Sequence, residues 1–396
     1  VRARIAVYLT FLANGLGLSN LVPRYPEVLA HLGITKAAFG QAVMFSSVGA
    51  LAAGLAASWC ITRFTSARVA SVGMIVLGLG LLGAGAAGSW LVLALCMAWV
   101  GGTDAIIDVA QNAHALRVER RWGSSIITSF HAAWSLGAVL GAVMGQAMAG
   151  AGVPIGLHMA GVLLVLTVVS AAAVPWTIKG PDSDDRPEDG PAGSPGPAGP
   201  RPGRPGARAR LLTVGAVVVL GLMCAAAMFP EDVTASWSSL LLAEQGAAPG
   251  MVGMGLVCLQ TTMIVGRLLG DAVIDRLGAR AVIAGGGALV AAGMGTALAA
   301  GSVPGTLVGM VIAGAGCAVA VPVAYAAADD VPGMRPGAGL TIVSWLARVI
   351  MLVSPPVVGW FADAHGTWVA LVYGLLGGAI LMASWPVLRR GARAGR

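Results

Sequence analysis

The repetition of long apolar runs constrains the fold of this chain more than any other feature. Twelve runs follow one another, each close to the ~20 residues that a helix needs to cross a bilayer. Only 10% of the 396 residues are charged, against about 25% in a soluble domain. The bilayer is therefore the expected solvent, and we expect an all-α membrane protein with twelve transmembrane helices. The runs lie near residues 5–23, 38–61, 69–87, 91–114, 125–149, 154–176, 211–230, 250–270, 280–300, 304–328, 338–361 and 367–388.

The basic residues divide unevenly between alternate loops. With the N-terminus inside, twenty of the 24 lysines and arginines fall in cytoplasmic segments, and two, Arg24 and Lys36, fall in external loops. The positive-inside rule then predicts a multi-pass protein of the cytoplasmic (inner) membrane with both termini in the cytoplasm. The net charge of +7 is attributed to topology and contact with anionic lipid, so no nucleic-acid partner is expected. Most tryptophans, Trp237 among them, lie near span ends and are expected to be interfacial anchors.

Residues 177–210 separate the first six runs from the last six. This segment is rich in Pro and Gly, is acidic first and basic later, and carries no large apolar side chain beyond Ile178. Because such a composition cannot bury enough apolar surface to form a core, we expect a disordered cytoplasmic linker. The predicted organisation is an N-terminal six-helix bundle at 1–176 and a C-terminal six-helix bundle at 211–396.

The two halves repeat at a single offset of 213 residues. That shift lays Leu29-Ala30-His31-Leu32-Gly33 over Leu242-Ala243-Glu244-Gln245-Gly246. One offset that holds across several helices indicates duplicated, pseudo-symmetric six-helix bundles. It also pairs Arg63 with Arg276, Thr65 with Gly278, His131 with Ser344, and Gly141 with Ser354.

The best-formed local motif joins the eighth and ninth runs, at Gly270-Asp271-Ala-Val-Ile-Asp275-Arg276-Leu-Gly278-Ala-Arg280. Gly278 permits a tight turn, and Asp275 with the two arginines can bridge neighbouring helix ends when that side of the protein is closed. We therefore expect Asp275, Arg276, Gly278 and Arg280 to act in gating, together with Arg63 of the first-half copy. The alternative is a basic loop that serves only to set topology. The first-half copy, at 62–68, lacks both the Asp and the Gly.

Twelve spans, a 6+6 duplication, a central linker and an Asp-Arg-x-Gly-x-Arg loop resemble the major facilitator superfamily. Four motifs are similar to its fucose-permease-like branch, in particular to uncharacterised bacterial inner-membrane members: Arg24-Tyr-Pro-Glu27, Asp108-Val-Ala-Gln-Asn112, Ser129-Phe-His131-Ala-Ala-Trp134-Ser-Leu-Gly137 and Trp237-Ser238. The resemblance implies a rocker-switch transporter, often proton-coupled, with a cavity at mid-membrane. Fucose permeases place an acid in the first span, where this chain offers only Asn14 and Asn20.

Two carboxylates stand in the fourth run. Asp104 and Asp108 lie about 40° apart around a helix and about 6 Å apart along it. Each costs about 2.5–3.5 kcal/mol to insert at a helix centre, so a functional role is the default hypothesis. Two carboxylates this close can share a proton, which suits proton coupling. The alternative is that they bridge helices, for example from Asp108 to His131 or to Arg117.

Several further polar or aromatic side chains are candidates for contact with a substrate. His131 could relay a proton or donate to a substrate, and Trp134 and Trp345 could stack on a ring. The alternative for each is an interhelical hydrogen bond or plain packing. Asn14, Asn112 and Gln260 complete the polar candidates on the helices expected to line the cavity.

Arg348 lies in the middle of the eleventh run. An unpaired arginine in lipid is very costly, so it must meet a carboxylate, a water-filled cavity or an anionic substrate group. The internal candidates for a partner are Glu231, Asp232 and Asp104. Glu231 follows Pro230, where the seventh span should break or kink, and is itself expected to contact substrate or act in external gating.

These features predict a secondary transporter that moves a small polar or anionic organic molecule by alternating access. The sequence contains no HExxH, no Walker loop and no nucleophile elbow, so we expect no enzymatic activity. The expected energy source is the proton gradient, with no cofactor and no metal, and the expected partners are a small-molecule substrate and the bilayer, with the protein as a monomer. The alternatives are an exporter of a metabolite or drug, and a receptor or scaffold on a transporter fold.

Overall fold

The computed structural model describes residues 1–122, 126–180, 182, 207–329, 331 and 338–388. Its regular structure over these residues is helical, and twelve helical segments are long and apolar enough to cross a membrane. The predicted fold class, an all-α protein with twelve transmembrane helices, is therefore confirmed.

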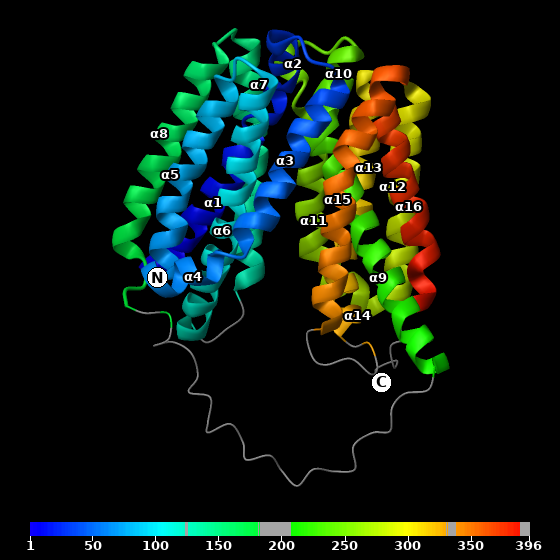
Figure 1. The fold of residues 1–396 in the computed structure, drawn as a ribbon. Coiled ribbons are helices and arrows are strands. Elements are labelled where there is room, and N and C mark those ends of the chain that lie inside the picture. The colour runs from blue at the N-terminus through cyan, green and yellow to red at the C-terminus, as the bar shows by residue number, and fades with distance from the viewer. Residues whose placement is uncertain (123–125, 181, 183–206, 330, 332–337, 389–396) are drawn as a thin grey trace.

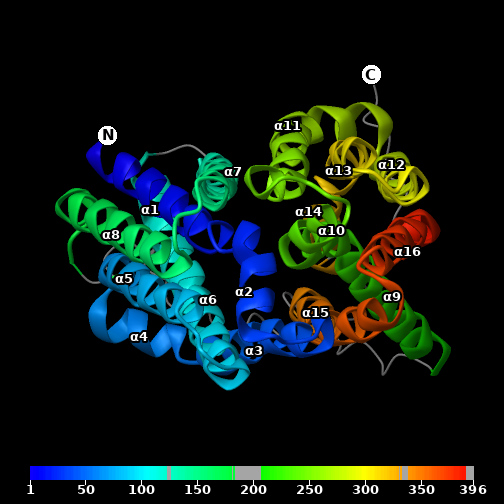
Figure 2. The same ribbon diagram turned by 90° about the horizontal axis from the view of Figure 1, so that it is seen from above.

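Within the described residues, the α-helices form two groups of eight that follow one another along the chain. The N-terminal half contains α1 (Arg2–Ser19), α2 (Tyr25–Leu32), α3 (Lys36–Gly54), α4 (Ala57–Phe64), α5 (Ser66–Gly85), α6 (Trp90–Trp122), α7 (Ile127–Gly150) and α8 (Ile155–Ala173). The C-terminal half contains α9 (Ala207–Asp232), α10 (Ser238–Glu244), α11 (Met254–Leu277), α12 (Ala279–Ala300), α13 (Val303–Cys317), α14 (Ala320–Asp329), α15 (Ala338–His365) and α16 (Val369–Ser384). Viewed along the helices, the two halves stand side by side (Figure 2).

The bundle has two distinct ends. We call the end at which α1 begins, α8 finishes and α9 begins the linker end, and the opposite end, where α2 and α10 lie, the distal end (Figure 1). The ribbons of the two halves approach each other at the distal end and separate toward the linker end (Figure 1). The main helix pairs across the interface are α3 with α15 and α7 with α11, and α2 also contacts α10.

The helices depart from the predicted runs in four places. The second run is divided at Leu55–Ala56 into α3 and α4, and the tenth is divided after Cys317 into α13 and α14. The fourth continues to Trp122 instead of ending near residue 114. The chain passes Pro230 inside α9 and then forms a π-helical turn at Val233–Trp237 before α10. The predicted break in the seventh span thus lies just beyond the proline, as a π turn rather than a sharp kink.

Glycines let α1 and α7 approach very closely. A Cβ atom at Gly137 or Gly141 would lie 2.0 Å from the carbonyl oxygen of Leu12 or 2.5 Å from that of Leu16, and one at Gly15 would lie 2.0 Å from the Trp134 oxygen. These distances show that the glycines of the fifth span serve close packing. The Gly78-Leu-Gly80 segment likewise lies within α5, against neighbouring helices.

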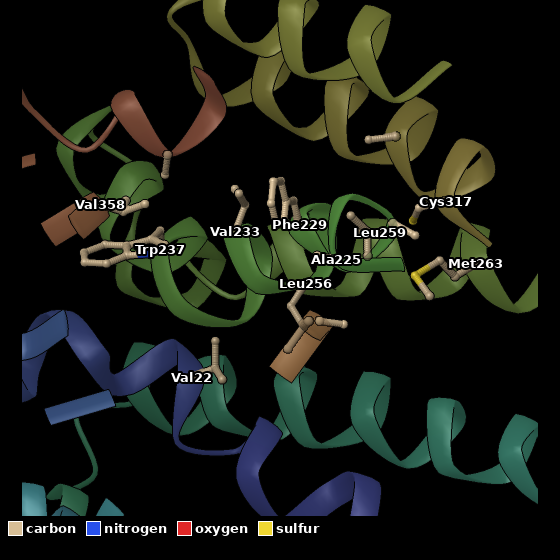
Figure 3. Packing of buried hydrophobic residues seen from close by; sticks show 14 of the residues in the cluster. Val22, Ala225, Phe229, Val233, Trp237, Leu256, Leu259, Met263, Cys317 and Val358 are labelled. Atoms are coloured by element: carbon tan, nitrogen blue, oxygen red, sulfur yellow. The ribbon is translucent and has the colours of Figure 1, made fainter. Parts of the chain in front are cut away.

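An apolar stripe on α9 and the following π turn packs in the core. Ala225, Phe229, Val233 and Trp237 follow one another at four-residue spacing and are almost completely buried (Figure 3). The Trp237 ring lies 6.1 Å from that of Phe39 on α3, edge to face, so this side chain also joins the two halves. Trp237 is 0% exposed, and its predicted role as an interfacial anchor is therefore wrong. Its position at the end of a π turn directs it inward, which span length alone does not reveal.

The two halves share the same backbone conformation at one pair of equivalent positions, although the residue there differs. Gly278, between α11 and α12, has φ 81° and ψ 148°. Thr65, its counterpart between α4 and α5, has φ 74° and ψ 147°. This region is almost exclusively populated by glycine, because a Cβ atom crowds the backbone there. The first half therefore holds the same turn with a strained threonine.

A polar contact fastens the distal end. The two carboxylate oxygens of Asp363, at the end of α15, accept hydrogen bonds from the backbone N–H groups of Lys36 (2.7 Å) and Ala37 (2.9 Å), at the start of α3. The Lys36 ammonium pairs with Glu244 of α10, whose carboxylate also accepts from Thr367. A carboxylate at a helix N-terminus satisfies orphan N–H groups and complements the helix dipole. We call Lys36, Ala37, Glu244 and Asp363 the distal lock.

Both ends of the predicted linker carry ordered structure. The carboxylate of Asp182 accepts hydrogen bonds from the Ser66 N–H (2.9 Å) and the Ser66 hydroxyl at the start of α5, and lies 3.3 Å from Arg117. At the other end α9 begins at Ala207. Of the segment predicted as disordered, residues 181 and 183–206 lie outside the described residues.

The strained turn yields a stability prediction. Thr65→Gly should raise the free energy of unfolding by about 1 kcal/mol, because relief of strain worth about 1–3 kcal/mol exceeds the added entropy cost of glycine. Thr62→Gly, within α4, is the control and should lower stability by about 1 kcal/mol. Thermal unfolding of both variants in detergent measures the difference. Equal losses for the two variants would show that the turn at Thr65 is not strained.

The distal lock yields a second prediction. Asp363→Asn removes the charge at the start of α3 and should weaken the distal contact by about 1 kcal/mol. Spin labels at two exposed distal positions, His31 and Ala248, in a background without the five native cysteines, should then report longer and broader distances. Asp275→Asn makes the same charge change at the linker end and should leave the distal distances unchanged. A distribution unaltered by Asp363→Asn would contradict the lock.

Candidate functional site

A cavity of about 380 Å³ lies between the two halves, on the linker side of the distal contacts. Residues of α3 and α6 form one wall, and Trp345 and Arg348 of α15 form the other. Asp104 and Asp108 both line it, near the middle of α6, and both are exposed. The predicted acids thus lie in an open space within the protein, where water can solvate them.

Arg348 stands between this cavity and a smaller one. The second cavity, of about 220 Å³, shares Ser47 and Arg348 with the first and adds Tyr325 and Ser344. Within the described residues, Arg348 makes no hydrogen bond or ion pair, and its side chain is exposed. Of the partners proposed for it, Glu231 pairs with another arginine and Asp232 accepts from Ser354. The cavity is therefore the environment that accommodates this cation.

Hydrogen bonds through Asn14 connect Asp104 of α6 to the neighbouring helices α1 and α7. The Asn14 amide nitrogen donates to Asp104 Oδ1 (2.7 Å), and its Oδ1 accepts from the Trp134 indole N–H (2.7 Å). Asn14 is 6% exposed, and both ends of its amide have protein partners. It therefore orients Asp104 relative to α1 and α7, and the predicted substrate-contact role of Asn14 and Trp134 has to compete with these bonds.

Asp108 makes its hydrogen bond within its own helix. Its Oδ1 accepts from the Asn112 amide at 2.9 Å, and that amide also donates to the Asp108 carbonyl. Arg117, one of the proposed bridging partners, pairs instead with Asp182. His131 is exposed and lies within electrostatic range of Asp108, as does Arg348. Asp108 is thus directed toward the cavity rather than into a bridge between helices.

A second polar cluster lies where α7, α9 and α11 meet. Arg267 donates to the Ser135 hydroxyl at 3.1 Å and lies 3.8 Å from Glu231 Oε1, to which Gln260 also donates at 3.3 Å. The structure thus brings the predicted residues Glu231 and Gln260 together, but away from the residues that line the central cavity. Gln260 is 4% exposed, and its Oε1 has no partner among the described residues.

Two charged residues of this region are missing from the sequence-based site. Arg267 joins the halves through Ser135, and Asp232 accepts hydrogen bonds from Ser354 (2.9 Å) and Ser236 (3.2 Å). The cost of a charge in an apolar run, which singled out Arg348, applies equally to Arg267 and Asp232. A charge within an apolar run is therefore a sequence signal that could have placed both Arg267 and Asp232 among the candidate site residues.

The predicted gating residues lie at the linker end and do not meet across the interface. Asp275 and Arg276 are exposed at the end of α11, and Gly278 forms the turn into α12. Arg280 donates to the carbonyl oxygens of Leu388 (2.6 Å) and Pro386 within its own half. Arg63 is exposed on α4, over the Phe64 ring. With the linker end apart, none of these contacts joins the halves, so the gating role stays a prediction.

A metal centre finds no support in the described part of the chain, where no three His, Cys, Asp or Glu side chains gather into a suitable group. The polar site consists instead of single charges and amides drawn from different helices. Such an arrangement can bind a small molecule and transfer protons at a carboxylate, since carboxylates and imidazoles are the side chains that exchange protons most readily.

Comparison with known proteins matches residues 7–241 to the family described as Major Facilitator Superfamily. An uncharacterised MFS-type transporter of Yersinia pestis is 25% identical over 372 residues, which cover 93% of this chain and 91% of the relative. Among solved structures, a variant of the nucleoside transporter NupG superposes with a TM-score of 0.72 at 11% identity, over 97% of this chain and 98% of that one. A D-xylose-proton symporter gives a TM-score of 0.70 at 15% identity, over 95% and 96%.

The Asn14 bridge yields a prediction that needs no substrate. Asn14→Ala leaves the Trp134 N–H and Asp104 without their partner and should lower the free energy of unfolding by about 1–3 kcal/mol. Asn112→Ala is the matched control, because it breaks bonds only within α6 and should cost less than about 1 kcal/mol. Thermal unfolding in detergent measures both. Equal, small losses would show that Asn14 does not bridge the three helices.

Proposed function

The chain belongs to the Major Facilitator Superfamily, and on that premise we propose that it is a secondary active transporter that moves a small polar or anionic organic solute by alternating access. The observation that carries this proposal is the cavity between the halves, which is lined by Asp104, Asp108 and Arg348. Charges from both halves line it near the middle of α6 and α15, where a solute would contact each half at once. A cavity of about 380 Å³ falls in the size range of small-molecule sites.

The contacts between the halves support alternating access. Those of the distal lock, with the apolar contact of Trp237 and Phe39, close one end. The cavity lies on the other side of these contacts, toward the end at which the halves separate (Figure 1). A rocking motion that opens the distal lock and closes the linker end would expose the same cavity to the opposite side.

Proton coupling is part of the proposal. Asp104 and Asp108 are the carboxylates that face the cavity, and Asp104 is joined to α1 and α7 through Asn14 and Trp134. A change in the protonation of Asp104 would therefore change a hydrogen bond that links three helices. This is the type of coupling between a proton and the packing of helices that a proton-linked transporter needs.

The remaining expectations belong to the same proposal. We place the protein in the cytoplasmic membrane as a monomer with both termini in the cytoplasm, where the distribution of basic residues supports it. The motifs at 108–112 and 129–137 support membership of the fucose-permease-like branch.

No cofactor, metal or enzymatic activity is proposed, and residues 177–210 are proposed as the linker between two six-helix domains. The Asp275-to-Arg280 loop and Arg63 are proposed to close the linker end.

Export is the second candidate within this family, because the cavity lies toward the proposed cytoplasmic end, from which an exporter loads. Import and export use the same cavity and differ in the direction of the proton and solute gradients. A thermal-stability screen with sugars, nucleosides, amino acids and organic acids selects solutes for proteoliposomes. Counterflow of a labelled hit then separates a transporter from a receptor, since a receptor binds without exchange.

Proton coupling predicts a specific phenotype for Asp104. Asp104→Asn should abolish uptake of a hit driven by a pH jump while counterflow of the same hit continues, because exchange needs no net proton movement. Pyranine trapped in the liposomes reports the accompanying proton flux. If Asp104→Asn and Asp108→Asn both leave uptake driven by pH intact, the assignment of the proton to these carboxylates is wrong.

A further inference from the structure

The charges that line the central cavity come in opposite signs from opposite halves. Asp108 belongs to α6 of the N-terminal half and Arg348 to α15 of the C-terminal half, and both line the same cavity. They are within electrostatic range of one another, yet no ion pair within 4 Å joins them. An anionic and a cationic group thus face the same open space without neutralising each other directly.

Neither group has a counter-ion in the part of the chain that the structure describes. Asp108 accepts one hydrogen bond, from the neutral amide of Asn112 on its own helix. Arg348 has no hydrogen bond or ion pair there. By contrast, other charges between the halves are paired, Lys36 with Glu244 and Arg267 with Glu231. Unlike these two pairs, Asp108 and Arg348 have no ion pair within the described residues.

From this juxtaposition we infer that the solute is a small zwitterion, which carries an ammonium group that binds Asp108 and a carboxylate that binds Arg348. The guanidinium presents its donors in a fork that matches a carboxylate. A simple anion would meet Arg348 but would be repelled by two carboxylates, and a simple cation would leave Arg348 unpaired in a partly apolar cavity. Only a solute that carries both a positive and a negative group can pair with Asp108 on one wall and with Arg348 on the other.

The rest of the lining fits a compact solute of this class. Ser46 and Ser47 offer hydroxyl groups, while Ala50, Leu51 and Trp345 offer apolar surface to a side chain. The adjoining cavity of about 220 Å³, with Met228, Tyr325 and Met351, extends past Arg348. The larger part of the site can thus hold the two charged groups, and the smaller part can hold a variable, mainly apolar substituent.

The position of the two charges makes them a solute site rather than a gate. Both lie near the middle of their helices, α6 and α15, whereas the predicted gating residues lie at the linker end. A zwitterion bound to both would draw α6 toward α15 and favour closure of the cavity around it. Asp104, held by Asn14, is then left to carry the proton while Asp108 binds the ammonium group.

This inference rests on the proposed transport function and has its own test. Purified full-length protein is titrated with the twenty L-amino acids and with β-alanine and γ-aminobutyrate, and binding is measured by thermal shift and calorimetry. Each zwitterion that binds is compared with its analogue that lacks the amine and with its analogue that lacks the carboxylate. We expect each analogue to bind at least about tenfold more weakly, the effect of losing one charge-assisted contact of about 1.4 kcal/mol.

Two variants assign the contacts. Arg348→Gln should abolish the preference for the zwitterion over the amine without a carboxylate, and Asp108→Asn should abolish the preference over the acid without an amine. Arg120→Gln, an exposed arginine at the linker end, is the control and should preserve both preferences. The inference is overturned if no zwitterion binds, or if selectivity persists in both variants.

Counterflow distinguishes failure of this inference from failure of the transport proposal. If a neutral sugar, a nucleoside or a simple anion exchanges through the wild-type protein while zwitterions do not, the protein is a transporter and the zwitterion assignment is wrong. If a zwitterion binds with the expected selectivity but does not exchange, the site assignment stands and the transport proposal fails.

Discussion

The absence of hydrogen-bonding partners in lipid is the constraint on which the rest of this structure depends. A charged side chain at the centre of a spanning helix costs about 2.5–3.5 kcal/mol unless it meets water or a partner. The charges of the spanning helices respond in two ways. Arg267 and Asp232 bind serine hydroxyls of neighbouring helices. Asp104, Asp108 and Arg348 face an open cavity instead. The cavity is therefore the environment that allows these three charges to exist in the membrane.

Close packing within each half determines where such a cavity can form. The glycines of α7 bring it almost into backbone contact with α1, and Gly49 and Gly101 do the same for α3 and α6. Packing at this distance leaves no space for a solute between the two helices of each of these pairs. The interface between the halves combines close packing of α3 on α15, where a Cβ atom at Gly40 would lie 2.2 Å from the Pro355 oxygen, with polar contacts such as the distal lock. The cavity opens beside these contacts, on the linker side, where residues of α3, α6 and α15 line it.

Much of the architecture is predictable from the sequence, because it depends on properties that repeat along the chain. Hydropathy predicts all twelve spans, and the 213-residue offset predicts that Thr65 occupies a turn equivalent to that of Gly278. The partners of single side chains are not predictable in the same way. That Asn14 bridges Asp104 and Trp134, or that Trp237 turns inward to Phe39, depends on the rotation of helices about their axes. Helix rotation is determined by packing, and a single sequence does not report it.

The contrast between Arg267 and Arg348 suggests how binding and motion are connected. Both arginines belong to the C-terminal half, and both lie at its interface with the other half. Arg267 already has its contact across the interface, to Ser135, so it favours the arrangement seen here. Arg348 lines the same cavity as Asp108 without such a contact and, on the zwitterion proposal, gains one when a solute binds. On that proposal, one arginine stabilises the open cavity and the other stabilises its closure around a ligand. Because a ligand shifts a conformational equilibrium only through its differential affinity for the two states, Arg348 is the residue through which the solute itself can drive the change.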